Sequence, residues 1–245
     1  MKPRFPSASR SAAPAALRGA LSVAALALVT GCATGPNANP ADPLEPLNRQ
    51  VARFNDTVDD AVLRPVATVY QRVLPSPIRT GVNNFFGNLS DVWSFVNSVA
   101  QLKLQDSAQT FMRVNVNTFF GLGGLLDIAT EAGLDRHSED FGQTLGRWGV
   151  PAGPYLVLPL LGPSTLRDAA ALPLDFRGDP VSYVSEVSVR NSLYALRLVD
   201  LRSNLLRASQ LLDDAALDRY TFTRDAFLQR RRSEVHDGNL PDDGN

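Results

Sequence analysis

The sequence has few of the residues that most enzymes use for catalysis. Its 245 residues include one cysteine and two histidines, and His236 lies in the polar C-terminal segment SEVHDGNLPDDGN. No G-x-S-x-G nucleophile motif is present, and a single cysteine excludes an internal disulfide framework. The adjacent side chains of His137 and Ser138 point apart, which disfavours a hydrolase built on that pair. The sequence therefore gives little reason to expect an enzyme or a catalytic residue.

Metal and nucleic-acid sites have equally little support. The only cluster of potential metal ligands is DRHSED, residues 135–140, and a solvated polar turn explains it better. Glycines in FFGLGGLLD, residues 119–127, lack the spacing of a dinucleotide loop and suit a bend or a close helix approach. Without the four basic residues of positions 1–31, 24 basic against 25 acidic residues become 20 against 25, a net charge of −5. That balance is not typical of a nucleic-acid binder.

The first 31 residues are predicted to be a signal peptide. Four basic residues precede the apolar stretch ALSVAALALVTG, residues 20–31. This stretch is shorter than the roughly 20 apolar residues of a membrane-spanning helix. The sequence VTGC resembles the lipobox of bacterial lipoproteins, in which the cysteine receives an S-diacylglycerol group and its new amine is acylated. Cys32 is therefore the predicted lipidation site, which also explains a lone cysteine in an exported protein.

The residues after Cys32 predict where the protein resides. Ala33 occupies the position at which the inner-membrane retention signal of Gram-negative lipoproteins has aspartate, and this resembles sorting to the periplasmic face of the outer membrane. Residues 32–41 are rich in Pro, Asn and Gly, which is typical of a flexible tether. We expect one domain over residues 42–232 and a disordered acidic tail over residues 233–245.

Helical spacing of apolar residues dominates the domain. Asp42 is a predicted N-cap, Pro43 the first helical residue, and Pro65 ends or kinks the helix. Five apolar residues between them share one helix face: Leu47, Val51, Phe54, Val58 and Val62. Further amphipathic helices are predicted over 181–205 and 211–232, the last ending in three arginines that complement the helix dipole. No alternating strand pattern is present, so the predicted fold is all-α.

Residues 81–130 contain five charged residues, half the density of the whole chain. Seven residues form a wide apolar arc on a helix within this stretch: Leu89, Val92, Trp93, Phe95, Val96, Val99 and Leu102. The opposite face carries Asn, Ser and Gln. The helix fits either the core of a globule or a membrane interface. Taken alone it favours the core, because interfacial helices usually carry more Lys and Arg.

The segment GPYLVLPLLGPS, residues 153–164, has no charged residue. It is too short to span a bilayer as a helix, and Pro159 argues against a central strand. Six glycines and prolines are predicted to fix its path as a turn: Gly149, Gly153, Pro154, Pro159, Gly162 and Pro163. Its apolar residues require either a protein core or lipid around them.

Six motifs together resemble the MlaA (VacJ) family of outer-membrane lipoproteins: DPLEPLNRQVARFN, NNFFGNL, GLGGLLDIA, EDFGQTLGRWGV, GPYLVLPLLGPSTLRD and QRRR. The match covers nearly all of the mature chain in the right order. Two departures concern backbone stiffness. Pro151 and Ala152 stand where some relatives carry another glycine, and three alanines at positions 169–171 replace a glycine-containing run.

The resemblance implies a single-domain helical ring whose amphipathic helices lie in the inner leaflet of the outer membrane. Members of the family surround an amphipathic channel, associate with a trimeric porin, and pass mislocalised phospholipid from the outer leaflet to a periplasmic lipid carrier. No cofactor is implied beyond the acyl groups on Cys32. The positions expected at the channel or the membrane are Phe54, Asn55, Phe85, Phe86, Trp93, Phe95, Tyr155, Leu156, Leu158 and Leu160.

Two other functions stay open. A structural lipoprotein that associates with porins without moving lipid would need the same anchor and apolar surface, but no amphipathic conduit. A phospholipase would depend on His137 and Ser138, and alanine at both positions would abolish it.

Overall fold

The computed structural model describes residue 39 and residues 42–239. The predicted signal peptide (1–31), the lipidation site Cys32 and the sorting residue Ala33 lie outside the described residues, as does the end of the predicted tail (240–245). The described α-helices are α2 (Glu45–Val58), α3 (Arg64–Val73), α4 (Ser76–Ala100), α5 (Leu104–Phe119), α6 (Ile128–Glu131), α7 (Phe141–Arg147), α8 (Leu166–Gly178), α9 (Val187–Ala215) and α10 (Arg219–Val235). Two short segments complete the helical part: the π-helix η1 (Asp59–Leu63) and the 3-10 helix η2 (Pro180–Tyr183).

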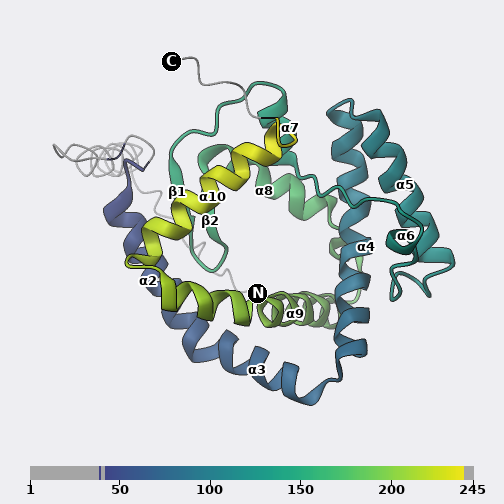
Figure 1. The fold of residues 1–245 in the computed structure, drawn as a ribbon, viewed down its shortest axis with the longest axis horizontal. Helices are drawn as coiled ribbons and strands as arrows, with labels where there is room; N and C mark the ends of the chain where they lie inside the picture. Colours follow the sequence, from purple (N-terminus) through teal and green to yellow (C-terminus); the bar gives the residue numbers. More distant parts are fainter. Residues whose placement is uncertain (1–38, 40–41, 240–245) are drawn as a thin grey trace, which may run out of the picture.

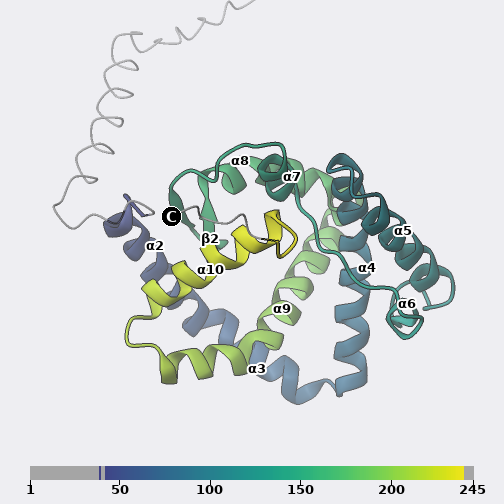
Figure 2. The same ribbon diagram turned by 45° about the horizontal axis from the view of Figure 1, so that its top comes forward.

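The elements follow one another around a common centre (Figure 1). In that view α3 and α9 lie along the lower edge, α4 on the right, α7 and α8 at the top, and α10 with the two strands toward the left. Helix α5 packs on the outer side of α4, away from that centre, and Figure 2 shows the same relation from a second direction. The fold is mostly helical, as predicted.

The start of the domain differs from its prediction. Helix α2 begins at Glu45, so the predicted N-cap role of Asp42 is wrong. The buried Asp42 carboxylate instead accepts hydrogen bonds from Asn48 Nδ2 at 2.8 Å and from the Tyr220 hydroxyl at 2.5 Å. Pro65 does not end the helix but follows η1, whose wider helical turn accommodates a residue that lacks an N–H and crowds the carbonyl four positions earlier.

The prediction that strands are absent is also wrong. Strands β1 (Tyr155–Leu158) and β2 (Gly162–Thr165) form an antiparallel hairpin in the register Tyr155↔Thr165 to Leu158↔Gly162. Pro159 lies in the turn, so it removes no donor from a strand. Pro163 does lie in β2, where a two-stranded sheet leaves one side of each strand free of ladder bonds.

The C-terminal boundary lies beyond the predicted one. Helix α10 continues past residue 232 to Val235, whose side chain is buried, and an ordered turn follows. Because an apolar side chain is buried there, the disordered tail does not start at residue 233.

The interior of the described chain is mainly polar. Buried polar and charged side chains outnumber buried apolar ones, and many large apolar side chains are exposed. Helix α4 shows this inversion: Asp91, Ser94 and Asn97 are buried, whereas Val92 and Val96 are 37% and 45% exposed. The core interpretation of this helix is therefore wrong, because its Asn, Ser and Gln face packs against α5 and α7. Among the described residues, no helix combines the length and apolarity needed to cross a bilayer.

A close approach at the end of α8 gives a test of the packing. A Cβ at Gly178 would lie 2.1 Å from a ring carbon of Trp93, whose Nε1 donates to Asp175 Oδ1 at 2.8 Å. Gly178→Ala is expected to lower the free energy of unfolding by about 1–3 kcal/mol, because the indole must move. In contrast, a Cβ at Gly81 in α4 meets only ordinary contacts at 3.7 Å. Gly81→Ala is therefore expected to stabilise by up to about 1 kcal/mol. Thermal melting of both variants checks this pair, and equal destabilisation would contradict the packing.

Candidate functional site: a hairpin between two cavities

Two asparagines of α2 hold the outer edge of β1. Asn48 Nδ2 donates to the Tyr155 carbonyl at 3.0 Å, and the Val157 amide donates to Asn48 Oδ1 at 2.9 Å. Asn55 repeats the pattern seven residues later, donating to the Leu158 carbonyl and accepting from the Leu160 amide. Seven helical residues rise about 10.5 Å, close to the roughly 10 Å spanned by three strand residues. The two side-chain amides therefore replace the strand that the hairpin lacks on this side.

The turn of the hairpin depends on the second asparagine. Leu160 has a φ of +63°, a conformation that costs a non-glycine residue about 1–2 kcal/mol. Its amide donates to Asn55 Oδ1 at 2.8 Å, which offsets part of this cost. Gly162, with a φ of +82°, then returns the chain into β2. The position of the tip is thus set from α2.

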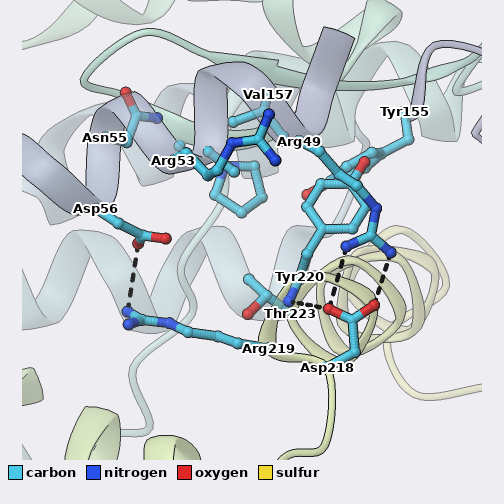
Figure 3. A pocket seen from close by; sticks show the side chains of 13 residues that line it. Arg49, Arg53, Asn55, Asp56, Tyr155, Val157, Asp218, Arg219, Tyr220 and Thr223 are labelled. Carbon is cyan, nitrogen blue, oxygen red and sulfur yellow. Dashed lines mark hydrogen bonds and ion pairs between the residues drawn. The ribbon is translucent and has the colours of Figure 1, made fainter. Parts of the chain in front are cut away.

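The first cavity, of about 410 Å³, lies between α2, the hairpin and the start of α10. Figure 3 shows Arg49 pointing toward Asp218 and Asp56 toward Arg219, at shortest N–O distances of 2.6 and 3.6 Å. The lining residues from α2 and the hairpin are Arg49, Ala52, Arg53, Asn55, Asp56, Tyr155, Val157, Gly162 and Pro163. The wall is therefore amphipathic, with charged groups on α2 and α10 and apolar surface on the hairpin.

The second cavity, of about 500 Å³, is enclosed mainly by α4, α8 and α9. Its apolar lining residues are Trp93, Leu161, Leu172, Phe176, Leu198 and Leu201. Polar groups on the same wall include Asp179 and Arg197, which form an ion pair at 2.8 Å. Leu161 lines this cavity and the next residue, Gly162, lines the first, so the hairpin tip lies between the two.

A half-buried carboxylate, that of Asp175, is part of the second cavity. Burial raises the pKa of Asp175 above its usual range, although hydrogen bonds from the Trp93 indole and the Phe141 amide act in the opposite direction. Asp175 lies on α8, and its Oδ1 accepts both hydrogen bonds, so it links α8 to Trp93 of α4 and Phe141 of α7. Its carboxylate therefore helps to position the indole on the cavity wall.

A buried arginine joins the elements behind the hairpin. Arg231 of α10 donates to Asp140 at 2.6 Å and to Asp168 at 2.9 Å, and Arg167 also pairs with Asp168. Burial acts to raise the pKa of Asp168, but hydrogen bonds and charge from Arg231 and Arg167 hold it below its usual range. The helix-dipole role predicted for the three terminal arginines is wrong for Arg231, because its side chain turns inward to carboxylates on α7 and α8.

Several residues of the DRHSED segment interact with other parts of the protein. Arg136 pairs with Asp91, and Lys103 pairs with Glu139 at 2.7 Å. His137 Nε2 lies 2.6 Å from Gln109 Oε1. No group of three or more potential metal ligands was found in the part of the chain that the structure describes.

A family model described as MlaA lipoprotein matches residues 40–234. The chain belongs to the MlaA lipoprotein family. It is 35% identical over 220 residues to the intermembrane phospholipid transport system lipoprotein MlaA of Escherichia coli K12, covering 87% of this chain and 86% of the relative. The Haemophilus influenzae protein of the same name is 33% identical over 235 residues, covering 89% and 90%.

A solved structure agrees with this assignment. It is described as the structural basis for maintenance of bacterial outer membrane lipid asymmetry. The two chains share 35% identity and a TM-score of 0.70, with 79% of this chain and 98% of the other covered. The MlaA fold thus extends over most of the present chain.

Several positions expected at the channel or membrane of this MlaA-family protein lie near the cavities. Asn55 and Tyr155 line the first cavity, and Trp93 lines the second. Leu156 and Leu158 are half-buried in β1, and Leu160 is exposed at the tip. Tyr155 also contacts the rings of Tyr220 and Phe227 edge-on, which ties β1 to α10.

The remaining expected positions lie elsewhere. Phe54 is half-exposed and lines neither cavity. Phe85 is half-buried, as is Phe95, whose ring packs 5.6 Å from that of Phe111. Phe86, expected at the channel or the membrane, is buried in the protein and lines neither cavity, which excludes a membrane contact only. Among the predicted turn residues, Gly149, Gly153 and Gly162 have positive φ values, and Pro154 precedes β1.

The hairpin clamp of this MlaA-family protein can be tested at a single amide. Asn55→Ala is expected to accelerate hydrogen exchange at the Leu160 amide at least about tenfold, because the substitution removes its acceptor. Phe54→Ala is the neighbouring control and is expected to leave that amide unchanged. Hydrogen exchange measured on the hairpin by mass spectrometry or NMR gives the comparison. Equal protection in the wild type and Asn55→Ala would contradict the clamp.

Proposed function

We propose that the chain is an outer-membrane lipoprotein that withdraws mislocalised phospholipid from the outer leaflet and passes it to a soluble periplasmic carrier. Its helices form a ring held in the inner leaflet, anchored by the acyl groups on Cys32. Phospholipid crosses through the amphipathic space beside the hairpin. A trimeric porin is the proposed partner in the membrane.

The inverted distribution of polarity is the observation that carries this proposal. Phe119 at the end of α5, and Phe120 and Leu122 in the turn that follows, are each at least 70% exposed. Large apolar side chains are also exposed on α3 and α4, and extended exposed apolar surface is typical of membrane or protein contact sites. Acyl chains would cover these side chains, while most of the buried polar side chains form hydrogen bonds inside the protein.

The two cavities support a route for an amphipathic molecule. A phospholipid needs an apolar surface for its acyl chains and polar groups for its phosphate. Leu161, Leu172 and Phe176 supply the apolar surface on one side of the hairpin tip, and Arg53 and Arg219 supply cations on the other. The hairpin tip between them is the proposed point of passage.

The proposal is tested by transfer to the carrier. The lipidated protein is placed in vesicles that contain labelled phospholipid, the periplasmic carrier is added outside, and its bound lipid is analysed by thin-layer chromatography. Intact phospholipid on the carrier, dependent on this protein, is the expected result. Fatty acid or lysolipid would indicate a phospholipase instead, and no transfer would indicate a structural lipoprotein. A Cys32→Ser variant, which lacks the anchor, provides the matched control.

A further inference from the structure

A third cavity lies between α3 and α9, and Arg79 in the first turn of α4 also lines it. Its volume is about 750 Å³, and it shares no lining residue with the two cavities beside the hairpin. Its lining residues include four arginines and no acidic residue: Arg64, Thr68, Gln71, Arg72, Arg79, Ser203, Asn204, Leu206, Arg207 and Gln210. This concentration of cations contrasts with the negative net charge of the mature chain.

The four arginines differ in how far their charge is already compensated. Arg64 pairs with Asp60 at 3.0 Å and with Asp213 at 3.1 Å. Arg79 donates to the Leu74 carbonyl, and its charge also acts on a buried aspartate of α9. Within the described residues, neither the Arg72 nor the Arg207 guanidinium has an ion-pair or hydrogen-bond partner. Two arginines without a partner, Arg72 and Arg207, therefore line the cavity together with two arginines that already have partners.

The cavity is built on a fixed frame. Residues 64, 68, 71 and 72 recur at helical spacing on one face of α3. Gln71 Nε2 donates to the Ser203 carbonyl at 2.7 Å, which joins that face to α9. The opposite face of α3 carries Val66, Val69 and Val73, all exposed. The helices that carry the arginines are thus packed against each other, and the apolar face of α3 points away from the cavity.

We propose that this cavity binds a phosphate group. Guanidinium groups bind phosphate through paired, charge-assisted hydrogen bonds, and Arg72 and Arg207 from opposite walls would neutralise one phosphate between them. The side-chain amides of Asn204 and Gln210 add neutral donors. The phosphate belongs either to a phospholipid headgroup or to a soluble phosphate compound. This site is distinct from the transport route proposed above.

The test uses the full lipidated chain in dodecyl maltoside, a detergent without phosphate. Inorganic pyrophosphate is titrated by calorimetry, and phosphatidylglycerol in mixed micelles is followed by native mass spectrometry, with diacylglycerol as the phosphate-free comparison. The double variant Arg72→Gln/Arg207→Gln is expected to bind at least about tenfold more weakly. The charge-matched control Arg177→Gln/Arg230→Gln changes two exposed arginines outside the cavity and is expected to bind like the wild type.

The outcomes separate the sources of phosphate. Loss of pyrophosphate binding in the cavity variant alone assigns a soluble ligand. Loss of one bound phosphatidylglycerol, with diacylglycerol unaffected, assigns a lipid headgroup. Equal weakening in both double variants, or no binding of either probe to the wild type below about 1 mM, would overturn the proposal. Arg72→Lys/Arg207→Lys keeps the charge but not the paired donors, so intermediate binding is expected even if the glutamine variant fails to fold.

Discussion

Replacing Arg231 with methionine is expected to lower the free energy of unfolding by about 3–5 kcal/mol, because it removes several charge-assisted hydrogen bonds. The partly exposed Asp140 loses this cation, and the buried Asp168 keeps only Arg167. Arg231 is the common donor to Asp140 and Asp168 and joins α10 to α7 and α8. Methionine fills a volume similar to that of arginine, so the loss of stability comes mainly from the missing charge and hydrogen bonds and not from an empty cavity. Thermal or denaturant unfolding followed by circular dichroism measures it.

The neighbouring arginine provides the matched control. Arg230 has the same sequence surroundings, but its side chain is 75% exposed and pairs with Glu234 one helical turn away. Arg230→Met is expected to change the free energy of unfolding by no more than about 0.5 kcal/mol. Equal losses in the two variants would show that the buried network does not hold α10.

The effect of Arg231→Met is also expected to depend on pH. In the wild type, the pKa of Asp168 is held below its usual range, so the stability that this carboxylate contributes is present above its unfolded pKa of about 3.9 and is lost as the pH falls through the folded value. In the variant, burial acts on Asp168 with Arg167 as its remaining cation, and protonation relieves part of the cost of burying this carboxylate. The stability difference between wild type and variant is therefore expected to narrow from pH 7 toward pH 4.

Helix positions were readable from the sequence because apolar spacing repeats over many residues. Which face of a helix points inward was not, since the same spacing serves a soluble core and a lipid-covered surface. In α4 the signal was the polar face itself, which carries Asn88, Ser94 and Asn97 rather than Lys or Glu. Small uncharged polar groups can be buried if they form hydrogen bonds, and Asn97 Oδ1 accepts one from Thr144.

The hairpin and the arginine network depend on contacts far apart in the sequence. Asn48 and Asn55 contact β1 from more than 100 residues away, so nothing local to residues 155–165 predicts two four-residue strands. Likewise, the run of three arginines in α10 contains no signal that Arg231 is the buried one. Its partners Asp140 and Asp168 lie 91 and 63 residues earlier and become neighbours only in the folded protein.

Leu161→Asp is expected to reduce phospholipid transfer at least about tenfold, the second large effect that the structure predicts. Leu161 is exposed at the hairpin tip and lines the second cavity with Leu172, Leu198 and Leu201. A carboxylate at this position would have to lose its hydration when acyl chains pass. A tenfold reduction in transfer corresponds to only about 1.4 kcal/mol of that desolvation penalty. Because the side chain is exposed in the protein alone, the melting temperature is expected to stay unchanged.

Leu160→Asp separates passage through the cavity from a general effect of charge at the tip. Leu160 is exposed to a similar degree but lines neither cavity, and its positive φ is one that aspartate tolerates. Transfer of labelled phospholipid to the carrier is therefore expected to stay within about twofold of the wild type in this control. If both variants lose transfer equally, the charge acts by disturbing how the tip meets the membrane. If neither does, lipid does not pass Leu161, and the route beside the hairpin is wrong.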